Sequence, residues 1–427
     1  MKVRFYTLGC KVNQFESRAM EGELLRHGYS VAVDGENADI TIINSCAVTG
    51  ASEQKAKKLI RRIRREDEST VLLLTGCMAQ TIKGELPEVD IILGNKRRID
   101  IVPVLEQYFE EKRNIRRVEE YSKNDEYEQL VVDDFSERTR AFLKIEDGCN
   151  RFCSYCIIPY ARGRVRSAPL DYIKREIESF RNAGYKEVVI VGINLSSYGS
   201  DIGLSFSDAI RTACSFTDMR IRLGSLEPES MDMQTLQILA SYDNFCPQFH
   251  LSLQSGCDAT LKRMNRHYTT ADYTKIVSDI RTVFDNPSIT TDVMVGFAGE
   301  TEEEFENSVR FVKDTGFAKV HVFPYSRRPG TVADRAPGQI GNAVKKQRAE
   351  IMGKAAAELQ SQFMKSQVGR TEKVLLETRR HDGAFEGYTP NYTLTYVKAP
   401  EEMAGKIVDV RLVQAADDHC TGKIITP

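Results

Sequence analysis

The 427-residue sequence has no tryptophan and only six histidines, and no apolar run in it approaches the roughly 18–20 residues of a membrane-spanning helix. We therefore expect no membrane association. An excess of one charge is also lacking, because 59 Lys and Arg residues face 61 Asp and Glu residues. This balance argues against a protein that coats nucleic acid by bulk charge, although a local basic patch is compatible with it.

The N-terminus, MKVRFYTLGC, enters a strand-like segment at once, without the apolar stretch and small-residue cleavage site of a secretory signal. We expect a cytoplasmic protein. Ten cysteines are then unexpected, because a reducing cytosol does not favour structural disulfides. Cytosolic cysteine patterns more often bind metals or take part in catalysis, so the thiols are the first candidates for a functional site.

The length predicts about three domains at roughly 150 residues per domain. In residues 1–110, short β-rich runs alternate with helical stretches, which predicts an α/β domain with a doubly wound parallel sheet. Residues 111–137 are mostly charged with little periodicity, and we expect them to form a surface linker.

Residues 138–367 contain apolar strand candidates separated by helical patterns, which predicts a partial (βα)6 barrel, short of the eight units that close a full one. The candidates lie at 142–146, 188–193, 221–226, 249–254, 292–297 and 319–325. A long helix is predicted to follow and to end near Gly369. Residues 368–427 hold short strands among turns, which predicts a small antiparallel β-barrel.

Cys149, Cys153 and Cys156 form a C-x3-C-x2-C run directly after the first predicted barrel strand. Iron–sulfur clusters usually take four Cys ligands, so three thiolates leave one iron open to a substrate or cofactor. Zinc is the alternative, but it also needs four ligands, and no Cys or His lies near in sequence to be the fourth. The position at the carboxyl end of a barrel strand, where such folds keep their chemistry, favours a cluster.

Cys10, Cys46 and Cys77 each follow a predicted strand of the N-terminal domain. The carboxyl ends of strands in a doubly wound sheet share one edge, and ligands bind in the crevice outside it. We therefore expect the three thiols to converge on a second cluster with an open iron. The alternative for each of these cysteines, taken alone, is that it is a small apolar residue buried in the core. The other four cysteines share no such placement and are expected to be structural: Cys214, Cys246, Cys257 and Cys420.

Short motifs follow one another over nearly the whole chain: GCKVNQFES (9–17), NSCAVT (44–49), GCMAQ (76–80), EDGCNRFCSYCIIP (146–159), GINLSSYG (192–199), RLGSLEP (222–228), HLSLQSGCD (250–258), MNRHYT (264–269) and FPYSRRPGT (323–331). In kind and order they resemble the methylthiotransferases of the radical S-adenosylmethionine superfamily. The resemblance implies an auxiliary-cluster domain, a radical domain and a C-terminal barrel of the TRAM type.

The segment LGCKVNQFES resembles the branch of this family that methylthiolates C2 of N6-threonylcarbamoyladenosine at position 37 of tRNA. The branches that act on isopentenyladenosine in tRNA or on a ribosomal-protein aspartate carry other residues after the first Cys, and their targets are the alternatives. A non-catalytic iron–sulfur scaffold or electron carrier is the alternative from another class of protein.

The resemblance also implies two [4Fe–4S] clusters and S-adenosylmethionine as cofactors. The cluster on Cys149, Cys153 and Cys156 would bind S-adenosylmethionine and cleave it to a 5′-deoxyadenosyl radical. The cluster on the other triplet would hold a sulfur methylated by one S-adenosylmethionine, while the radical from a second activates C2 of the adenine. The implied partners are tRNA bearing N6-threonylcarbamoyladenosine and an electron donor such as flavodoxin or ferredoxin, with the sulfur donor unknown.

Five further residues are predicted to contact the cofactor. Tyr155 stands where an aromatic of the family typically meets the adenine of S-adenosylmethionine, with barrel packing as the alternative. Asn194, Glu227, Gln254 and Asp292 fall near the carboxyl ends of successive predicted strands, so they are expected to point to the barrel mouth. Polar residues satisfied within loops or core are the alternative for these four.

A predicted helix at 55–65, KAKKLIRRIRR, has an apolar side of Leu59, Ile60 and Ile63 and a basic side suited to phosphates. A merely solvated basic face is the alternative. The predicted RNA contacts on this helix are Lys55, Lys58, Arg61, Arg62 and Arg65, and its basic side also carries Lys57 and Arg64.

Three arginines that follow the tight triplet, Arg162, Arg164 and Arg166, are predicted to contact tRNA phosphate or the cofactor. In the C-terminal barrel, acidic and basic residues nearly balance. An RNA role there would therefore rest on shape, a one-sided charge distribution, or stacking by residues such as Phe385, Tyr388 and Tyr392. Aromatic core packing is the alternative for these side chains.

Overall fold

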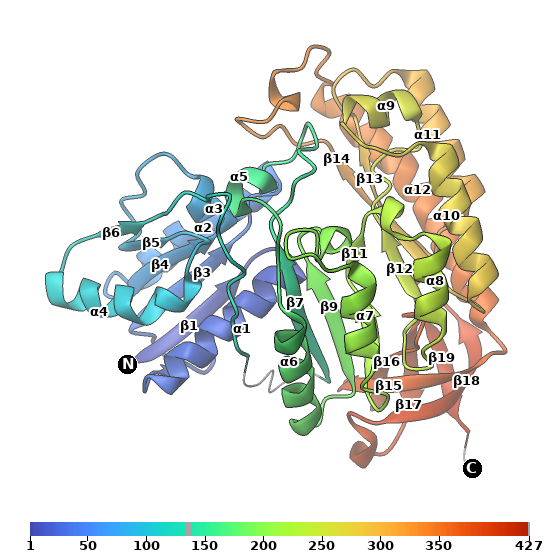
Figure 1. Cartoon of the computed structure of the whole chain (residues 1–427), viewed down its shortest axis with the longest axis horizontal. Coiled ribbons are helices and arrows are strands. Elements are labelled where there is room, and N and C mark those ends of the chain that lie inside the picture. Colours follow the sequence, from blue (N-terminus) through green and yellow to red (C-terminus); the bar gives the residue numbers. More distant parts are fainter. Residues whose placement is uncertain (133–138, 426–427) are drawn as a thin grey trace.

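The computed structural model describes residues 1–132 and 139–425, which form three packed parts (Figure 1). An N-terminal α/β unit lies beside a central partial barrel, and a small closed barrel lies against the lower ends of the central strands. The predicted fold class is thus confirmed. None of the helices in the described residues has the length and apolar character that crossing a membrane requires.

The N-terminal sheet has six parallel strands in the order β2-β1-β3-β4-β5-β6. The strands are β1 (Lys2–Thr7), β2 (Ser30–Val31), β3 (Ile40–Ser45), β4 (Val71–Gly76), β5 (Ile91–Leu93) and β6 (Ile115–Arg117). The order reverses between β1 and β3. In doubly wound sheets, ligands bind outside the carboxyl ends of the strands at such a reversal.

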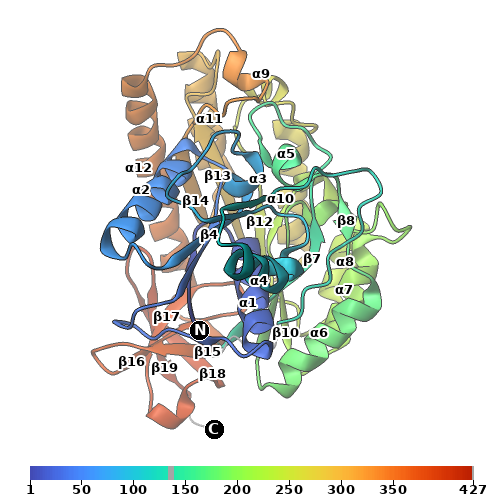
Figure 2. The same cartoon turned by 90° about the vertical axis from the view of Figure 1, so that its left-hand side faces the viewer.

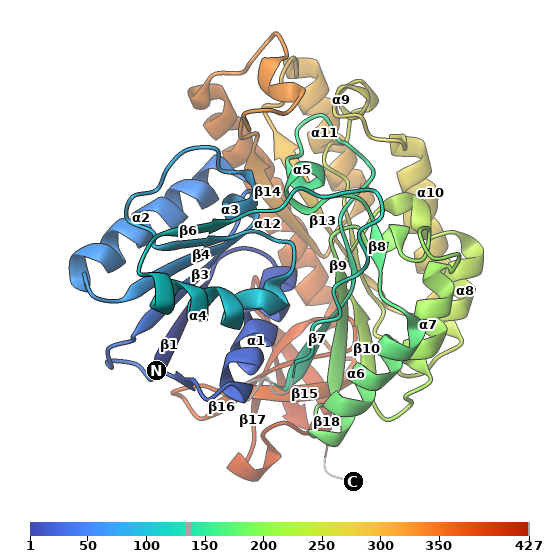
Figure 3. The ribbon, with the colours of Figure 1, turned by 60° about the vertical axis from the view of Figure 1, so that its left-hand side comes forward.

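Helices cover both faces of this sheet (Figure 3). Helices α1 (Lys11–Arg26) and α4 (Ile101–Glu111) bury Leu24 and Leu105 against one face, and the short helix η1 (Arg98–Asp100) precedes α4. Helices α2 (Gly50–Glu66) and α3 (Cys77–Thr81) cover the other, where Ile60 and Ile63 are buried as the helical pattern predicts.

The expected linker at 111–137 is partly wrong. Strand β6 extends the first sheet to residue 117, and Leu130 and Val132 are buried in the central core. A three-residue strand is too short to give a periodicity that the sequence could reveal. Residues 133–137 of the expected linker lie outside the described residues.

The central domain contains every predicted barrel strand, in two four-stranded sheets ordered β10-β9-β7-β8 and β11-β12-β13-β14. The strands are β7 (Arg140–Asp147), β8 (Arg166–Ser167), β9 (Glu187–Gly192), β10 (Arg220–Leu223), β11 (Ser225–Leu226), β12 (Gln248–Leu251), β13 (Ser288–Val295) and β14 (Lys319–Pro324). All pairs are parallel except β7–β8. Strands β10 and β11 come from one predicted run that breaks at Gly224, where the two sheets meet.

Helices connect these strands and cover the outside of the barrel (Figure 2). The longer ones are α6 (Leu170–Asn182), α7 (Phe206–Cys214), α8 (Met233–Ala240), α10 (Thr270–Val283), α11 (Glu302–Thr315) and α12 (Asn342–Gln367). The short ones are α5 (Ile158–Arg162), α9 (Asp258–Arg263), η2 (Leu195–Ser197), η3 (Pro228–Ser230) and η4 (Ala333–Arg335). Capping boxes begin three of the longer helices, at Ser205, Thr269 and Thr301.

Helix α1 belongs to the first domain by sequence but contributes to the core of the second. Its side chains Val12, Phe15 and Ala19 are buried in the same apolar cluster as Phe142 and Val191 of the barrel strands. Figure 1 shows α1 between the N-terminal sheet and β7. The N-terminal domain therefore completes the hydrophobic core of the partial barrel.

The C-terminal domain is a closed barrel in the order β15-β16-β17-β19-β18. Its strands are β15 (Thr371–Arg379), β16 (Ala384–Tyr388), β17 (Leu394–Lys398), β18 (Ile407–Ala415) and β19 (Cys420–Ile424), with the short helix η5 (Glu401–Met403) before β18. All pairs are antiparallel except β17–β19. Phe385 is buried in the core of this barrel, so the predicted stacking of Phe385 on RNA is wrong.

A buried arginine fixes the C-terminal barrel to the central one. Arg222 donates from Nε to Glu187 Oε1 (2.7 Å) and from Nη1 to the Pro390 carbonyl (2.8 Å). Both Arg222 and Glu187 have no solvent exposure. A buried ion pair is costly to break, because the remaining partner is left as an unpaired buried charge.

We expect Arg222→Met to lower the stability of the chain by about 3–5 kcal/mol, because it leaves the buried Glu187 carboxylate with only the distant Arg220 guanidinium, at 4.0 Å. Thermal and urea unfolding would measure the loss. Arg211→Met, at an exposed position on α7, is the matched control and should change stability by less than about 0.5 kcal/mol. Equal midpoints for the two variants would show that the pair does not hold the domains together.

Candidate functional site

The tight cysteine triplet lies in the loop that leaves β7. Gly148 precedes it with φ +87°, and a Cβ there would lie 1.9 Å from the Arg164 carbonyl oxygen, so the loop requires glycine. The Cys149 N–H donates to the Gly163 carbonyl (3.1 Å) and the Cys156 N–H donates to the Cys153 carbonyl (2.9 Å). These bonds fix the backbone of the loop that carries the three thiols.

Polar groups from three segments donate to the sulfurs of this triplet. Cys149 Sγ accepts from the Arg151 N–H (3.5 Å) and from Asn194 Nδ2 (3.7 Å), and Cys153 Sγ accepts from Arg266 Nη1 (3.4 Å). Burial, followed by the neighbouring Cys153 and Cys149 thiols, raises the pKa of Cys156 to about 12. The three sulfurs therefore share one electrostatic environment.

The second triplet assembles at the carboxyl edge of the N-terminal sheet. Cys10 caps α1, Cys46 follows β3 and Cys77 begins α3, so Cys10 and Cys46 flank the strand-order reversal. A Cβ on Gly9 would lie 3.1 Å from Cys46 Cβ. After the larger effect of desolvation, the Cys77 thiol contributes to raising the pKa of both Cys10 and Cys46. The predicted convergence of these three residues is thus found in the structure.

The two triplets lie near each other. Cys77 packs in one apolar cluster with Ala47, Ile157 and Ala161, and Ile157 directly follows Cys156. In the part of the chain that the structure describes, no three His, Cys, Asp or Glu side chains lie close enough to hold a single metal ion.

A fully buried arginine connects the second triplet to the loop of the first. Arg162 donates from Nε to Cys77 Sγ (3.2 Å) and from Nη1 to Glu16 Oε1 (2.7 Å) and Asp147 Oδ1 (3.0 Å). Asp147 lies two residues before Cys149. Glu16 and Asp147 also share the ammonium of Lys144, which lies 3.1 Å from each.

The charges of this network set the state of its carboxylates. Burial opposes ionisation of Glu16, but Arg162, Arg98 and Lys144 outweigh it and lower the pKa of Glu16 to about 2. Arg98 Nη2 lies 3.1 Å from Glu16 Oε1, and both side chains are fully buried. The neighbouring carboxyl behaves differently, because burial raises the pKa of Glu146 well above its ordinary value. Glu146 accepts the N–H of Asn194 (2.7 Å).

The predicted RNA contacts at Arg162 and Arg166 are wrong. Arg162 is fully buried, and Arg166, 7% exposed, donates to the carbonyls of Arg162 (2.8 Å) and Arg164 (2.7 Å). The sequence pattern shows three nearby cations but not the buried carboxylates from distant segments that pair with them. Arg164 is exposed as expected, with its guanidinium 4.7 Å from the centroid of the Phe152 ring.

Three family models match the chain, each over one of the three parts. The model described as the radical SAM superfamily matches residues 143–312, the one described as uncharacterized protein family UPF0004 matches residues 2–94, and the one described as the TRAM domain matches residues 365–425.

Curated relatives match over almost the full length. The threonylcarbamoyladenosine tRNA methylthiotransferase MtaB of Bacillus subtilis (strain 168) is 35% identical and covers 99% of this chain and 96% of its own. The chain belongs to the radical S-adenosylmethionine methylthiotransferase family. The MtaB of Thermotoga maritima is 39% identical over 91% of this chain and 90% of its own. A Clostridium botulinum (strain Loch Maree) tRNA-2-methylthio-N(6)-dimethylallyladenosine synthase is 32% identical, covering 98% and 96%.

Solved structures share the fold of this methylthiotransferase. The cobalamin- and [4Fe–4S]-bound radical S-adenosylmethionine methyltransferase TsrM of Kitasatospora setae aligns with a TM-score of 0.57 at 13% identity, over 78% of this chain and 74% of its own. OxsB, a cobalamin-dependent S-adenosylmethionine radical enzyme, aligns with a TM-score of 0.52 at 10% identity, over 83% and 56%. At these identities, the likeness concerns the fold alone.

The methylthiotransferase has four of its five predicted cofactor residues at the barrel mouth. Asn194 and Glu227 follow β9 and β11, and Glu227 forms an ion pair with Arg266, which reaches Cys153. Gln254, beyond β12, adopts φ +65°, a strained conformation for a residue other than glycine. The carboxamide oxygens Asn194 Oδ1 and Gln254 Oε1 are buried and have no hydrogen-bond partner among the described residues.

Tyr155 lies between the triplet and an aromatic cluster. Its ring meets Phe297 edge-on with centroids 6.2 Å apart, and Phe297 meets Tyr325 at 5.0 Å. Burial raises the pKa of Tyr155 well above its ordinary value, and the Cys153 and Cys156 thiols raise it further. Tyr155 therefore packs against the aromatic side chains of the barrel, and it lies next to the Cys153 and Cys156 thiols.

The expected position of Asp292 at the barrel mouth is wrong. Strand β13 begins four residues earlier, at Ser288, so Asp292 lies in mid-strand, and its Oδ2 is 3.3 Å from His250 Nε2. Its side chain lines a cavity inside the barrel. The sequence run beginning at Asp292 is apolar, whereas the preceding Ser288–Thr291 is polar enough to hide the start of the strand.

Arg266 and Glu146 are part of the mouth, although sequence pattern alone did not single them out. Arg266 lies in the MNRHYT motif, and Glu146 directly precedes Asp147 in EDGC. Two features of the sequence could have indicated them. Glu146 stands three residues before Cys149, and Arg266 lies in a motif to which no role had been given.

The predicted RNA residues on α2 are all exposed: Lys55, Lys58, Arg61, Arg62 and Arg65. Arg64, on the same helix, is different, because its guanidinium donates to the Glu88 carbonyl (2.8 Å) and pairs with Asp90 (2.7 Å). Arg64 therefore anchors α2 to its own domain. A groove of about 1260 Å³ adjoins α2 at Glu53 and is lined by these cations: Lys83, Arg116, Lys123, Arg164, Arg328 and Arg335.

We expect Arg162→Met to destabilise the protein by roughly 3–5 kcal/mol, because it leaves Glu16 and Asp147 short of a buried cation. Amide hydrogen exchange should rise in α1 and in the loop at 148–156, and thermal unfolding should shift downward. Arg164→Met, at the exposed neighbouring position, is the control. Unchanged exchange in α1 would mean that Arg162 does not couple the two domains.

Proposed function

We propose that this enzyme methylthiolates C2 of N6-threonylcarbamoyladenosine at position 37 of tRNA. That it is a radical S-adenosylmethionine enzyme acting on tRNA follows from its family. The proposed target is supported by the LGCKVNQFES segment and by the names of the relatives with 34–39% identity, against 31–32% for the dimethylallyladenosine synthases. The observation that supports the methylthiotransferase chemistry itself is the pair of neighbouring cysteine triplets on two different sheets.

The residues at each triplet fit a [4Fe–4S] cluster. Three thiols leave one iron without a protein ligand, and N–H donors reach the sulfurs in both places, from Arg151, Asn194 and Arg266 in one and from Arg162 in the other. The unpartnered carboxamide oxygens of Asn194 and Gln254 could accept hydrogen bonds from S-adenosylmethionine. The family accounts for one such cluster, and the second is our proposal.

We propose a division of roles between the triplets. Cys149, Cys153 and Cys156 would hold the cluster that cleaves S-adenosylmethionine, and Cys10, Cys46 and Cys77 would hold the cluster that carries the sulfur. When bound, these clusters supply one electron to a sulfonium and a site for a transferable sulfur, and two S-adenosylmethionine molecules are used per product.

The protein's own part is to bind, position and exclude water. Glu227 holds the Arg266 guanidinium against Cys153, and Asn194 spans from Cys149 Sγ to Ser197 Oγ (2.7 Å). Tyr155, packed on Phe297, would form an apolar wall beside the cofactor. Asp292, inside the barrel, is not included among the proposed cofactor contacts.

The proposed domains are an auxiliary-cluster domain, a radical domain and a TRAM domain, with the first extended to residue 117 to include β6. We propose flavodoxin or ferredoxin as the electron donor, because sulfonium cleavage consumes an electron that side chains of this chain cannot supply. The tRNA would contact the exposed cations of α2 and Arg164, since the net charge is only −2 and positive charge must be concentrated locally.

Two cysteine variants test the division of roles. Cys149→Ala should abolish 5′-deoxyadenosine formation, whereas Cys77→Ala should retain it and lose methylthio transfer. Both products are scored in one anaerobic incubation with tRNA carrying N6-threonylcarbamoyladenosine. Cys214→Ala, on a buried cysteine of α7, is the matched control. Methylthio product from either test variant would refute the assignment, and modification of a ribosomal peptide instead of tRNA would refute the substrate.

A charge reversal tests the surface of α2. Replacing Arg61, Arg62 and Arg65 by Glu should weaken tRNA binding and lower the slope of log K against log salt by roughly 2–3, since each phosphate contact contributes about 0.7–0.9. Reversal of Lys346, Lys354 and Lys365 on α12 is the control. An unchanged affinity and slope would remove α2 from the RNA interface.

A further inference from the structure

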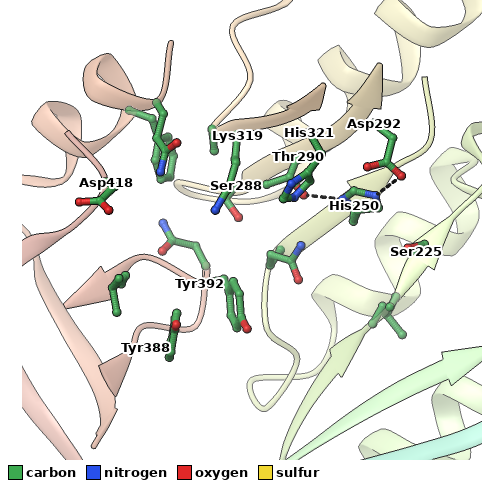
Figure 4. Close-up of a pocket in the computed structure, with 18 of the residues that line it drawn as sticks. Ser225, His250, Ser288, Thr290, Asp292, Lys319, His321, Tyr388, Tyr392 and Asp418 are labelled. Atoms are coloured by element: carbon green, nitrogen blue, oxygen red, sulfur yellow. Dashed lines mark hydrogen bonds and ion pairs between the residues drawn. The ribbon is translucent and has the colours of Figure 1, made fainter. Parts of the chain in front are cut away.

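A cavity of about 460 Å³ lies inside the central barrel, where the C-terminal barrel closes its lower side (Figure 4). Its size is that of a small-molecule pocket. All three domains line it: Lys11 comes from α1, Ser288 and Lys319 from β13 and β14, and Tyr388 and Tyr392 from the C-terminal barrel. The radical chemistry proposed above assigns nothing to this cavity.

The cavity lies beside the second cysteine triplet and is connected through β13 to the barrel mouth. Lys11 directly follows Cys10 of the second triplet. Asp292 lines the cavity, and its backbone carbonyl accepts the N–H of Gln254 (2.9 Å), a residue at the barrel mouth. The cavity is thus in contact with residues next to one triplet and next to the barrel mouth.

The lining is polar and incompletely paired. The His250 ring contacts two polar side chains, as the dashed lines of Figure 4 show. Its Nδ1 forms a hydrogen bond with Thr290 Oγ1 (3.0 Å), and its Nε2 lies 3.3 Å from Asp292 Oδ2. The Ser288 side chain is 2% exposed, and its hydroxyl has no hydrogen-bond partner in residues 1–132 and 139–425. A buried hydroxyl without a partner is unfavourable, so a ligand that supplies one is favoured.

Two ammonium groups in the lining also lack an anion. Lys11 is half-buried and Lys319 is exposed at the edge of the cavity, and neither forms an ion pair or side-chain hydrogen bond within the described part of the chain. The carboxylates of the lining already have partners: Asp292 Oδ2 lies 3.3 Å from His250 Nε2, and Asp418 Oδ1 lies 2.8 Å from His419 Nδ1, with Lys319 also helping to lower the pKa of Asp418. The cavity therefore offers two cations to an anionic ligand.

An aromatic wall limits the cavity on the side of the C-terminal barrel. Tyr388 and Tyr392 stack with centroids 4.5 Å apart at 19°, and Arg222 lies 4.6 Å above the Tyr392 ring. Figure 4 shows both tyrosines across the cavity from Ser288 and Lys319. Because Arg222 is itself anchored by Glu187, this wall is fixed before a ligand binds.

We propose that the cavity binds the N6 substituent of the target adenosine, with the substituent's carboxylate at Lys11 and Lys319. The inference rests on the proposed function and names what selects its substrate. A threonylcarbamoyl group has a carboxylate, a hydroxyl and a urea, which match the two lysines, Ser288 and the His250–Asp292 pair. An isopentenyl group would leave these polar groups unpaired, and sites of that kind reject such analogues strongly.

The test uses the cluster-loaded enzyme and three anticodon stem-loop RNAs that differ only at position 37. One carries N6-threonylcarbamoyladenosine, one isopentenyladenosine and one unmodified adenosine. For Lys319→Met, we expect the affinity for the threonylcarbamoyl RNA to fall about 10- to 100-fold, as for a lost hydrogen bond to a charged group. The affinity for the other two RNAs should not change, and Lys319→Arg should retain most of the affinity.

Two further variants sharpen the result. Ser288→Ala should weaken binding of the threonylcarbamoyl RNA by roughly 2- to 10-fold, as for one neutral hydrogen bond. Lys275→Met, which removes an exposed lysine paired with Asp279 on the outer helix α10, should leave all three affinities unchanged. The thermal unfolding midpoint and the iron content of each variant should match those of the wild type, which shows that it folds and carries its clusters.

Two outcomes would overturn the inference. If Lys319→Met weakens all three RNAs equally, the lysine contacts a backbone phosphate rather than the substituent. If Lys319→Met and Ser288→Ala leave the preference for the threonylcarbamoyl RNA intact, the cavity does not read the substituent. The proposed function fails separately, if the wild-type enzyme binds the threonylcarbamoyl RNA but forms no methylthio product on it.

Discussion

The arrangement of the site depends on one buried carboxylate, that of Glu16. It lies between two domains with no solvent exposure, and a charge in that position is tolerated only because Arg162, Lys144 and Arg98 surround it. Through these partners Glu16 fixes α1, and therefore Cys10, relative to the end of β7 and the loop that carries Cys149. The distance between the two triplets is thus set by ion pairs within the protein.

The same network explains how a chain of nearly neutral charge can provide a positive interior. Four cations, Arg98, Lys144, Arg162 and Arg166, lie around two ionised carboxylates, Glu16 and Asp147. Arg162 of this network donates to Cys77 Sγ (3.2 Å), where its charge would partly neutralise an anionic cluster. The net charge is a sum over the whole chain, so it does not reveal where cations and carboxylates gather locally.

Local features of the sequence were sufficient to predict the strands, the long helices and the six candidate cluster cysteines, because strand ends and cysteine spacing are properties of short segments. Contacts between residues far apart in the sequence could not be predicted from such local features. Arg162 looks like a surface cation until Glu16, 146 residues away, is placed against it. Asp292 looks like the start of a strand until the pairing of Thr290 with Lys319 shows that β13 began earlier. The three-residue β6 is visible only through its partner β5.

Helix α1 has a further consequence for how the chain folds during synthesis. Val12, Phe15 and Ala19 find their apolar partners on β7 and β9, which are made only after the N-terminal sheet is complete. A nascent N-terminal domain would therefore display an apolar helix face for a time on the order of ten seconds at ordinary rates of translation. During that interval the segment is a target for chaperones, and expression of residues 1–117 alone would leave the face permanently open to aggregation.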